Sequence, residues 1–160
     1  MERFYNAYEE VSMSNIIEVK VYKSTGINIP KYQSSGASGF DFETSEDITI
    51  NPDEVLLIGT GLKMDIPKGF ELQVRPRSGI SYKTKLRIAN SPGSIDSDYR
   101  GEIKIIMHNI GKTIEYIKKG DRIAQGVFSP VYQAIFKNVN SENDLKKTNR
   151  GENGFGSTGV

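Results

Sequence analysis

Two acids, a phenol and a base fall within five positions, at Asp96, Asp98, Tyr99 and Arg100. The preceding Pro92-Gly93 is a turn dipeptide, which predicts that two short extended arms fold back on one another. Because extended backbone sends successive side chains to opposite faces, both acids would share a face with Arg100 while Tyr99 lies on the other. Such a hairpin holds a carboxylate and an aromatic ring at a fixed separation. Taken alone, the stretch is better explained as a polar turn, so the functional interpretation depends on the rest of the chain.

A second segment, Arg75-Pro76-Arg77-Ser78-Gly79, carries two guanidiniums and a hydroxyl. It lies where a strand is predicted to pass into a helical turn over 78–83, with Ser78 as the cap. Backbone N–H groups at a helix start, with arginines beside them, suit a phosphate. Surface arginines next to an N-cap serine explain so short a motif equally well.

The third segment, residues 150–159, reads Arg-Gly-Glu-Asn-Gly-Phe-Gly-Ser-Thr-Gly. Its composition is typical of a phosphate-cradling loop, since glycines let backbone N–H groups turn inward and Ser and Thr add donors. It lacks the lysine and following helix of a Walker A loop, which excludes a nucleotide motor. Phe155, between two glycines, suits stacking on a flat ligand better than packing in a core.

His108 is the only histidine, so no serine–histidine triad can form without it. It follows an apolar run, and we expect a strand histidine with no chemical role. The sequence contains no Cys/His cluster or carboxylate-rich loop that would enclose a metal; a magnesium ion carried in by phosphates stays open. Together, arginines and a glycine loop for a polyphosphate, an aromatic ring for a base, and Asp96 or Asp98 to activate water indicate a nucleotide hydrolase.

The composition bounds these interpretations. The chain has 160 residues, enough for one domain with a substantial core, and its formal net charge is +1. Bulk electrostatics therefore predict neither nucleic acid nor an acidic membrane as partner. The absence of cysteine excludes disulfides, thiolate nucleophiles and cysteine metal sites. Apolar runs are too short to span a bilayer, and the acidic, aromatic N-terminus is unlike a signal peptide, so we expect a soluble intracellular protein.

From residue 15 onward, short runs of alternating or apolar residues recur between turn signals, with no long helical period. This pattern predicts an all-β sandwich, jelly roll or barrel. Residues 1–14 form an N-terminal extension, 15–139 the β-barrel core, and 140–160 a flexible C-terminal arm that is too polar to fold alone. The expected strands are 17–21, 40–44, 48–50, 54–60, 69–75, 86–89, 103–108, 113–117, 122–128 and 134–139.

Five motifs in this order resemble those of the trimeric deoxyuridine triphosphatases, which cleave dUTP to dUMP and pyrophosphate. Each is weak alone, but five in sequence with suitable spacing are specific. They are Ala-Ser-Gly-Phe-Asp (37–41), Pro-Arg-Ser-Gly (76–79), Gly-Ser-Ile-Asp-Ser-Asp-Tyr-Arg-Gly (93–101), Gly-Asp-Arg-Ile-Ala-Gln (120–125) and Arg-Gly through Gly-Ser-Thr-Gly (150–159).

The resemblance implies a jelly-roll-like β-barrel, a homotrimer, and active sites at subunit junctions that act with Mg²⁺ in the cytoplasm, or in the host cytoplasm if the source is viral. Asp96 would be the base that deprotonates the attacking water, and Tyr99 would pack on the deoxyribose. The hairpin containing Asn90 would read uracil. The other implied substrate contacts are Arg77, Ser78, Gly79, Gly93, Ile95, Lys104, Gln125, Arg150, Phe155, Gly156, Ser157 and Thr158, and Asp41 would support the magnesium waters or the trimer.

Such an enzyme limits uracil in DNA and supplies dUMP for thymidylate synthesis. Two alternatives stay open. A dCTP deaminase shares the fold and the phosphate sites, although the hairpin over 94–99 and the complete glycine-rich tail favour the hydrolase. The other alternative is a regulatory module that uses the fold to bind another protein, as a role added to the enzyme.

Overall fold

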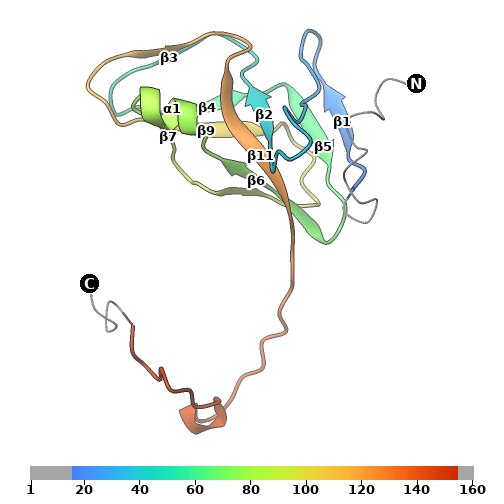
Figure 1. The fold of residues 1–160 in the computed structure, drawn as a ribbon, viewed down its shortest axis with the longest axis vertical. Coiled ribbons are helices and arrows are strands. Elements are labelled where there is room, and N and C mark those ends of the chain that lie inside the picture. The colour runs from blue at the N-terminus through green and yellow to red at the C-terminus, as the bar shows by residue number, and fades with distance from the viewer. Residues whose placement is uncertain (1–15, 155–160) are drawn as a thin grey trace.

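The computed structural model describes residues 16–154 as a jelly-roll-like β-barrel in which every named strand pair is antiparallel (Figure 1). Two larger sheets form most of it. One has the order β2 (Phe40–Glu43), β11 (Arg122–Pro130), β6 (Phe70–Arg75), β8 (Gly93–Ile95), and the other β4 (Val55–Gly59), β9 (Lys104–Asn109), β7 (Leu86–Ile88). The all-β prediction is confirmed.

Two-stranded sheets close the remaining sides of the barrel. They pair β1 (Lys20–Lys23) with β5 (Leu62–Asp65), and β3 (Ile48–Ile50) with β10 (Glu115–Ile117). One short helix, α1 (Ser78–Lys83), follows β6, and a 3₁₀ turn, η2 (Glu142–Asp144), interrupts the C-terminal arm. No helix within residues 16–154 is long and apolar enough to cross a membrane.

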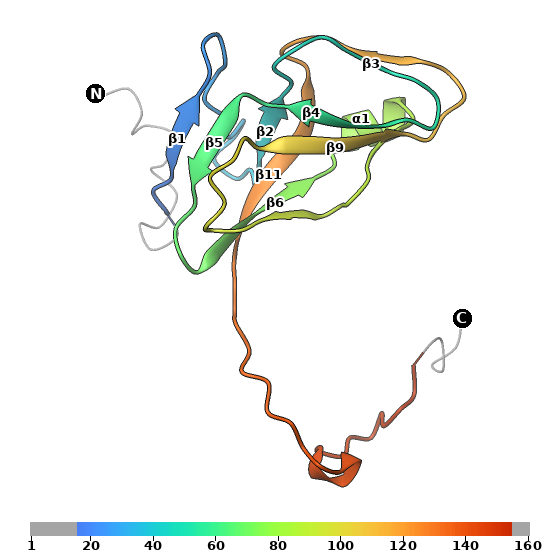
Figure 2. The same ribbon diagram turned by 180° about the vertical axis from the view of Figure 1, so that it is seen from behind.

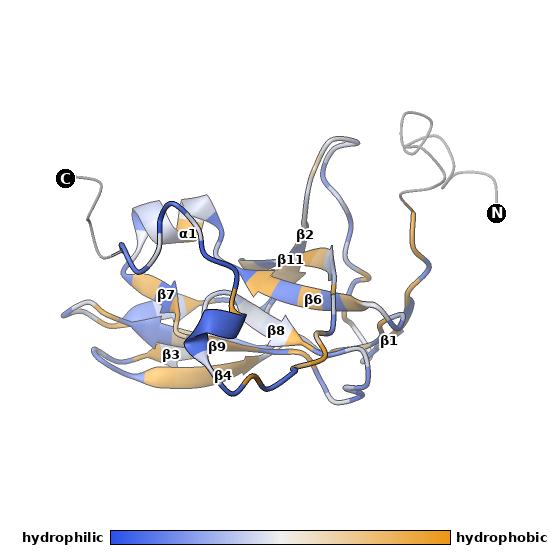
Figure 3. Cartoon of the chain, turned by 90° about the horizontal axis from the view of Figure 1, so that it is seen from below, coloured by the Kyte–Doolittle hydropathy of each residue, from blue (hydrophilic) through white to orange (hydrophobic). Residues whose placement is uncertain are grey.

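The core forms because apolar side chains alternate with polar ones along the strands. In β2, Phe40 and Phe42 are buried while Asp41 lies at the surface boundary. The two phenylalanine rings meet edge to face, with centroids 5.2 Å apart. The same alternation is visible as apolar and polar bands along β6 and β11 (Figure 3). Strands such as β2 and β6 therefore contribute one face to the core and leave the other for polar side chains.

Asn109, at the end of β9, is a fully buried polar side chain. Its Nδ2 donates to the carbonyl oxygens of Ile50 and Thr113, at 3.0 and 2.8 Å, and its Oδ1 accepts from the N–H of Gly111 at 2.9 Å. These bonds satisfy backbone groups that the sheets leave unpaired, and they connect β9 to β3 and to the following loop. Asn109 therefore holds together the end of β9, the end of β3 and the loop that follows β9.

Most expected strands are confirmed with boundaries shifted by one or two residues, and 48–50 agrees in full. The first strand begins at Lys20 rather than residue 17, because pairing with β5 starts there. Strands β5 and β8 were not predicted. The helical turn over 78–83 is confirmed, but Ser78 is its first residue and not its cap; Arg77 is the N-cap and makes no side-chain capping bond.

The strand expected over 134–139 is wrong. Strand β11 ends at Pro130, and residues 131–139 leave the sheet and run away from the barrel (Figure 1, Figure 2). The large apolar residues that suggested a strand are exposed, Ile135 by 98% and Phe136 by 95%, and so is the preceding Tyr132, by 94%. The amphipathic pattern expected in residues 1–14 lies outside the described residues.

Candidate active site

The turn formed by residues 96–99 places the side chains of Asp96 and Tyr99 in one pocket. The N–H of Tyr99 donates to the carbonyl oxygen of Asp96 at 3.1 Å, so the chain bends directly after β8 and is not extended here. The prediction that Asp96 and Tyr99 lie on opposite faces is therefore wrong: both line one pocket, of about 590 Å³, which we call the hairpin pocket. Asp98 and Arg100, together with Asp96 and Ser97, line a second groove, which we call the groove behind the turn.

The segment before the turn crosses between the two larger sheets. Strand β7 pairs with β9, whereas β8 pairs with β6, so the two arms of the hairpin do not pair with each other as expected. Asn90 lies at this crossing, and a Cβ at Gly93 would be 3.0 Å from its Nδ2. Asn90, Gly93 and Ile95 all line the hairpin pocket. We call the part lined by these three residues the inner end of the pocket; Gly93 is buried there, whereas Asn90 is exposed.

Tyr99 lines the hairpin pocket, and its side chain is held at the phenol end. Its hydroxyl donates to the carbonyl oxygen of Glu102 at 2.9 Å. Its ring lies directly over Gly101, where a Cβ would be 2.3 Å from the phenol oxygen. Only glycine leaves room for the ring in this position.

Glu102 and two lysines give the hairpin pocket its remaining charges. The carboxylate of Glu102 accepts from the N–H of Gly61 at 2.9 Å and lies 3.9 Å from Nζ of Lys104. Lys63, on β5, also lines the pocket, and sequence reasoning missed it. The alternation of Leu62 and Met64 with outward-facing Lys63 was the signal that could have revealed β5. Among residues 16–154, no cation lies within ion-pairing distance of Asp96.

Arg77 forms a second polar centre near the start of α1. Its Nε donates to Oδ1 of Asp41 at 2.6 Å and its Nη1 to the carbonyl oxygen of Arg122 at 2.9 Å. Nη1 of Arg122 donates to the other oxygen of Asp41 at 3.3 Å. Two guanidiniums therefore share one carboxylate, which leaves a net positive charge beside Ser78.

Ser78 and Gln125 line another pocket, of about 560 Å³, which we call the helix pocket. Gln125 donates from Nε2 to the carbonyl oxygen of Pro76 at 2.8 Å, which fixes its amide beside α1. Gly79 has open space around its Cα, so the start of α1 is accessible to a ligand. The helix pocket and the hairpin pocket share no lining residue.

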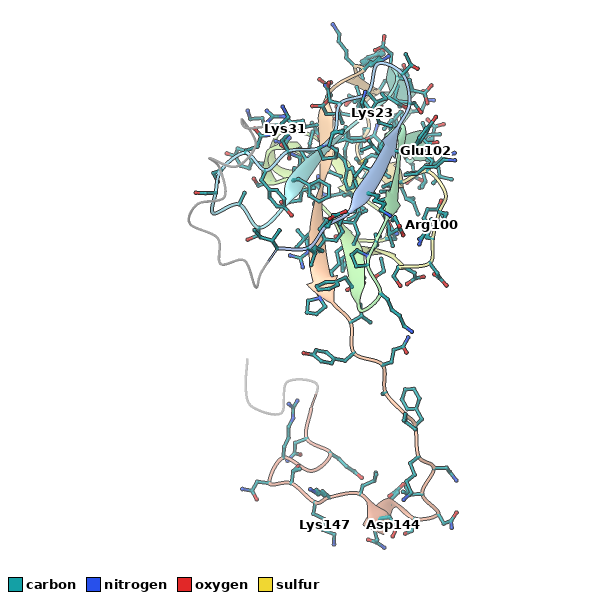
Figure 4. All side chains as sticks on the ribbon, turned by 90° about the vertical axis from the view of Figure 1, so that its right-hand side faces the viewer. Lys23, Lys31, Arg100, Glu102, Asp144 and Lys147 are labelled. Carbon is teal, nitrogen blue, oxygen red and sulfur yellow. The ribbon has the colours of Figure 1, made fainter. Side chains whose placement is uncertain are left out.

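The remaining predicted site residues lie elsewhere. Arg150 donates from Nε to the carbonyl oxygen of Asn153 at 2.8 Å and is exposed. The C-terminal arm, on which Asp144 and Lys147 are labelled in Figure 4, lies apart from the barrel. The expected contacts at Phe155, Gly156, Ser157 and Thr158 lie outside the described residues. His108 contacts Oδ1 of Asp53 at 3.1 Å and lines none of the pockets described above, so a structural role stays the prediction.

Asp41 is a poor candidate for a magnesium site, since both of its carboxylate oxygens accept bonds from guanidiniums. Within residues 16–154, no group of three or more His, Cys, Asp or Glu side chains is arranged to hold a metal ion.

Comparison with known proteins identifies the family. The model of the dUTPase family matches residues 25–159. The chain belongs to the dUTPase family. Among similar curated proteins, the deoxyuridine 5'-triphosphate nucleotidohydrolase of Nautilia profundicola is 50% identical over 131 residues, which cover 82% of this chain and 90% of that protein. The enzyme of the same description from Chlamydia felis is 47% identical over 137 residues, covering 84% and 93%.

Solved structures of the dUTPase family share this fold. A mutant dUTPase of Staphylococcus bacteriophage 80alpha, 28% identical, covers 91% of this chain and 99% of its own, with a TM-score of 0.80. Another mutant of that enzyme, solved with dUpNHpp, is also 28% identical, covers 89% and 99%, and has a TM-score of 0.78. A mutant dUTPase from phage phi11 of Staphylococcus aureus, 25% identical over 78% and 98% with a TM-score of 0.73, coordinates a structural Mg(II) ion.

Proposed function

We propose that this protein hydrolyses dUTP to dUMP and pyrophosphate, with Asp96 as the general base. The observation that carries the proposal is the turn that brings Asp96 and Tyr99 into one pocket with Asn90 and Gly93. A carboxylate that can accept a proton from water, beside an aromatic ring that can pack on a sugar, suits the hydrolysis of a nucleotide.

In this reaction, Asp96 accepts a proton from a water molecule as the water oxygen bonds to the α-phosphorus. The bond from the α-phosphorus to the bridging oxygen of the β-phosphate breaks, and pyrophosphate leaves. Asp96 suits this role because no cation in the described part of the chain is paired with it, so its oxygens are available to water. Asp98 is a weaker candidate, since it lines only the groove behind the turn.

Tyr99 and Asn90 select the nucleoside in this proposal. The Tyr99 ring packs on the deoxyribose, and its bond to the Glu102 carbonyl keeps it where a ribose 2′-hydroxyl would have to fit. Uracil lies at the inner end of the hairpin pocket, against Asn90, Gly93 and Ile95. A pocket that rejects an extra hydroxyl or methyl by steric exclusion needs rigid walls, and both the ring and the backbone crossing are held by hydrogen bonds or close packing.

The triphosphate must reach beyond the hairpin pocket. Arg77, Ser78, Gly79 and Gln125 suit phosphates. Ser78 and Gln125 line the helix pocket together with the guanidinium of Arg75, and Arg77 and Gly79 flank Ser78 in the chain. Since the helix pocket and the hairpin pocket share no lining residue, we assign them to different subunits of one active site. This supports a homotrimer in which each site is built at a subunit junction.

The C-terminal arm completes the site in this proposal. Residues 131–139 expose Tyr132, Ile135 and Phe136 and lead the chain away from its own barrel, which favours a neighbouring subunit as their partner. Arg150, Ser157 and Thr158 would then bind the γ-phosphate, with Phe155 and Gly156 over the base. Residues 140–160 can extend ~70 Å at ~3.3 Å per residue, enough to reach an adjacent site.

Magnesium enters the proposal as part of the substrate. A Mg²⁺ ion bound to the triphosphate neutralises phosphate charge, and phosphate oxygens with water are the ligands it prefers. The described residues supply no metal cage, and Asp41 is occupied by two guanidiniums, so we assign Asp41 to orienting Arg77. We place the activity in the cytoplasm, of the host if the source is viral, where it would limit uracil in DNA.

Pyrophosphate release, measured with Mg²⁺ across the deoxynucleoside triphosphates and UTP, tests this function. We expect release from dUTP and little from dTTP, dCTP or UTP. Chromatography of the dCTP reaction separates the alternative, because a deaminase of the same fold would form dUTP without pyrophosphate. Deamination of dCTP, or similar rates with dUTP and dTTP, would contradict the proposal.

A further inference from the structure

One side chain, Arg100, links the turn that carries Asp96 and Tyr99 to a strand distant in sequence. Its Nη1 donates to the carbonyl oxygens of Ser97 and Tyr99, at 2.7 and 3.0 Å. Its Nη2 donates to Oδ1 of Asp65 at 2.5 Å, thirty-five positions earlier in the chain. Asp65 is the last residue of β5. A single guanidinium therefore joins the inside of the turn to the barrel.

The same contact keeps a positive charge off the proposed base. Asp96, Asp98 and Arg100 all line the groove behind the turn, yet the only described carboxylate within ion-pairing distance of Arg100 belongs to Asp65. A guanidinium bonded to Asp96 would occupy the lone pairs that must accept a proton from water. Asp65 thus holds Arg100 in a position where it supports the turn without competing with water for Asp96.

We propose that Arg100 is a positioning residue for catalysis and that Asp65 is its anchor. The inference rests on the proposed function, because it acts through Asp96 and Tyr99. Arg100 and Asp65 are half-exposed, with 56% and 48% of their side chains accessible, and exposed ion pairs contribute little to folding stability. A displacement of a reacting group by about 1 Å, in contrast, can cost about 100-fold in rate. The pair therefore affects catalysis far more than stability.

A double-mutant cycle with Arg100→Gln, Asp65→Asn and the double variant tests the pairing. We expect Arg100→Gln to lower kcat for dUTP by about 10- to 100-fold, since the turn loses both carbonyl bonds. KM should change much less, because the inner end of the hairpin pocket, at Asn90 and Gly93, does not contact Arg100. Asp65→Asn should cost less than Arg100→Gln. The double variant should lose no more than Arg100→Gln alone, because Asp65 acts only through Arg100.

Selectivity for dUTP over UTP is a further measurement. It would stay unchanged if Arg100 served only to stabilise the fold. Loosening the turn also frees Tyr99, so the ratio of kcat/KM values for dUTP and UTP should fall in Arg100→Gln. Arg100→Lys should recover only part of kcat, because one ammonium group cannot reach both carbonyls and Asp65. Arg87→Gln is the matched control: Nη1 of Arg87 also donates to two carbonyls, those of Thr84 and Leu86, but neither belongs to the turn.

Three results would overturn the inference while wild-type dUTP hydrolysis stands: unchanged kcat and discrimination in Arg100→Gln, losses that add in the double variant, or an equal loss in Arg87→Gln. If Arg100→Gln fails to fold, Arg100→Lys and Asp65→Asn carry the same comparison, and wild-type behaviour in both would overturn it. Absence of dUTP hydrolysis by the wild-type protein would instead reject the proposed function.

Discussion

Replacing Gly101 with alanine isolates the contribution of the Tyr99 ring through a single methyl group. A Cβ at this position would lie 2.3 Å from the phenol oxygen and 2.4 Å from Cζ. Non-bonded carbon atoms require about 3.5 Å, so the ring must move by about 1 Å or more. Gly101 is not among the glycines with positive φ, so alanine adds no backbone strain of its own.

The expected loss of activity in Gly101→Ala follows from the contacts that the Tyr99 ring loses. Its hydrogen bond to the Glu102 carbonyl, 2.9 Å long, is worth about 0.5–1.5 kcal/mol. A sugar wall displaced by about 1 Å should reduce kcat/KM for dUTP by about 10- to 100-fold. UTP gains the space that its 2′-hydroxyl needs, so its kcat/KM should fall less. The preference for dUTP over UTP should therefore narrow by about tenfold, or about 1.4 kcal/mol of differential binding.

Steady-state pyrophosphate release with both nucleotides measures this ratio. Gly36→Ala is the matched control, because a Cβ there meets nothing within 4 Å and its φ is also not positive. An unchanged dUTP-to-UTP preference in Gly101→Ala, at normal folding, would show that the sugar filter lies elsewhere. A crystal structure of the variant in which Tyr99 still bonds the Glu102 carbonyl would show that the added methyl group does not displace the ring.

Three further results are expected. Asp96→Asn should lower kcat by about 10²–10⁴ with little change in KM, because the proton acceptor is lost while the shape is kept. Truncation after Asn149 should leave a folded protein with kcat/KM reduced by about 100-fold or more, as judged by circular dichroism and pyrophosphate release. Asn109→Ala should lower the free energy of unfolding by about 2–4 kcal/mol in urea titrations, because the carbonyls of Ile50 and Thr113 lose a buried donor.

Each of these has a contrary outcome. Near wild-type turnover by Asp96→Asn would move the base to Asp98. Full activity of the truncated chain would remove the C-terminal arm from catalysis. Mixed trimers of truncated and Asp96→Asn subunits should regain partial activity, and no rescue would mean that each arm serves its own subunit. Asn109→Ala with unchanged stability would show that water replaces the side chain.

The hairpin over residues 90–102 shows which features of the site could be predicted from the sequence. The residue types at 90–101 predicted a carboxylate and an aromatic ring near a turn, and the structure has both. The assumption of extended backbone failed, because the bond from the Tyr99 N–H to the Asp96 carbonyl bends the chain and places both side chains on one side. The pattern of residue types therefore indicated the chemistry, whereas local hydrogen bonding set the direction of each side chain.

Long-range partners account for most of what sequence reasoning missed. The salt bridge of Arg77 with Asp41 and the contact of Arg100 with Asp65 join positions thirty-six and thirty-five apart, and no local pattern encodes either one. The strand expected over 134–139 is wrong because no neighbouring strand in the described part of the chain pairs with these residues. Residues 134–136 and 139 are apolar, but a strand also needs a neighbouring strand, and β11 ends at Pro130.

The position of β11 has a consequence for how the chain folds as it is synthesised. The last strand lies inside its sheet, between β2 and β6, whose nearest residues precede it by more than forty positions. Until residue 130 leaves the ribosome, β2 and β6 have no strand between them, and that sheet cannot close. Folding must therefore wait for nearly the whole chain, and pairings of such high contact order form slowly. In that interval the nascent chain exposes unpaired strand edges, which favour association with other chains until β11 pairs with β2 and β6.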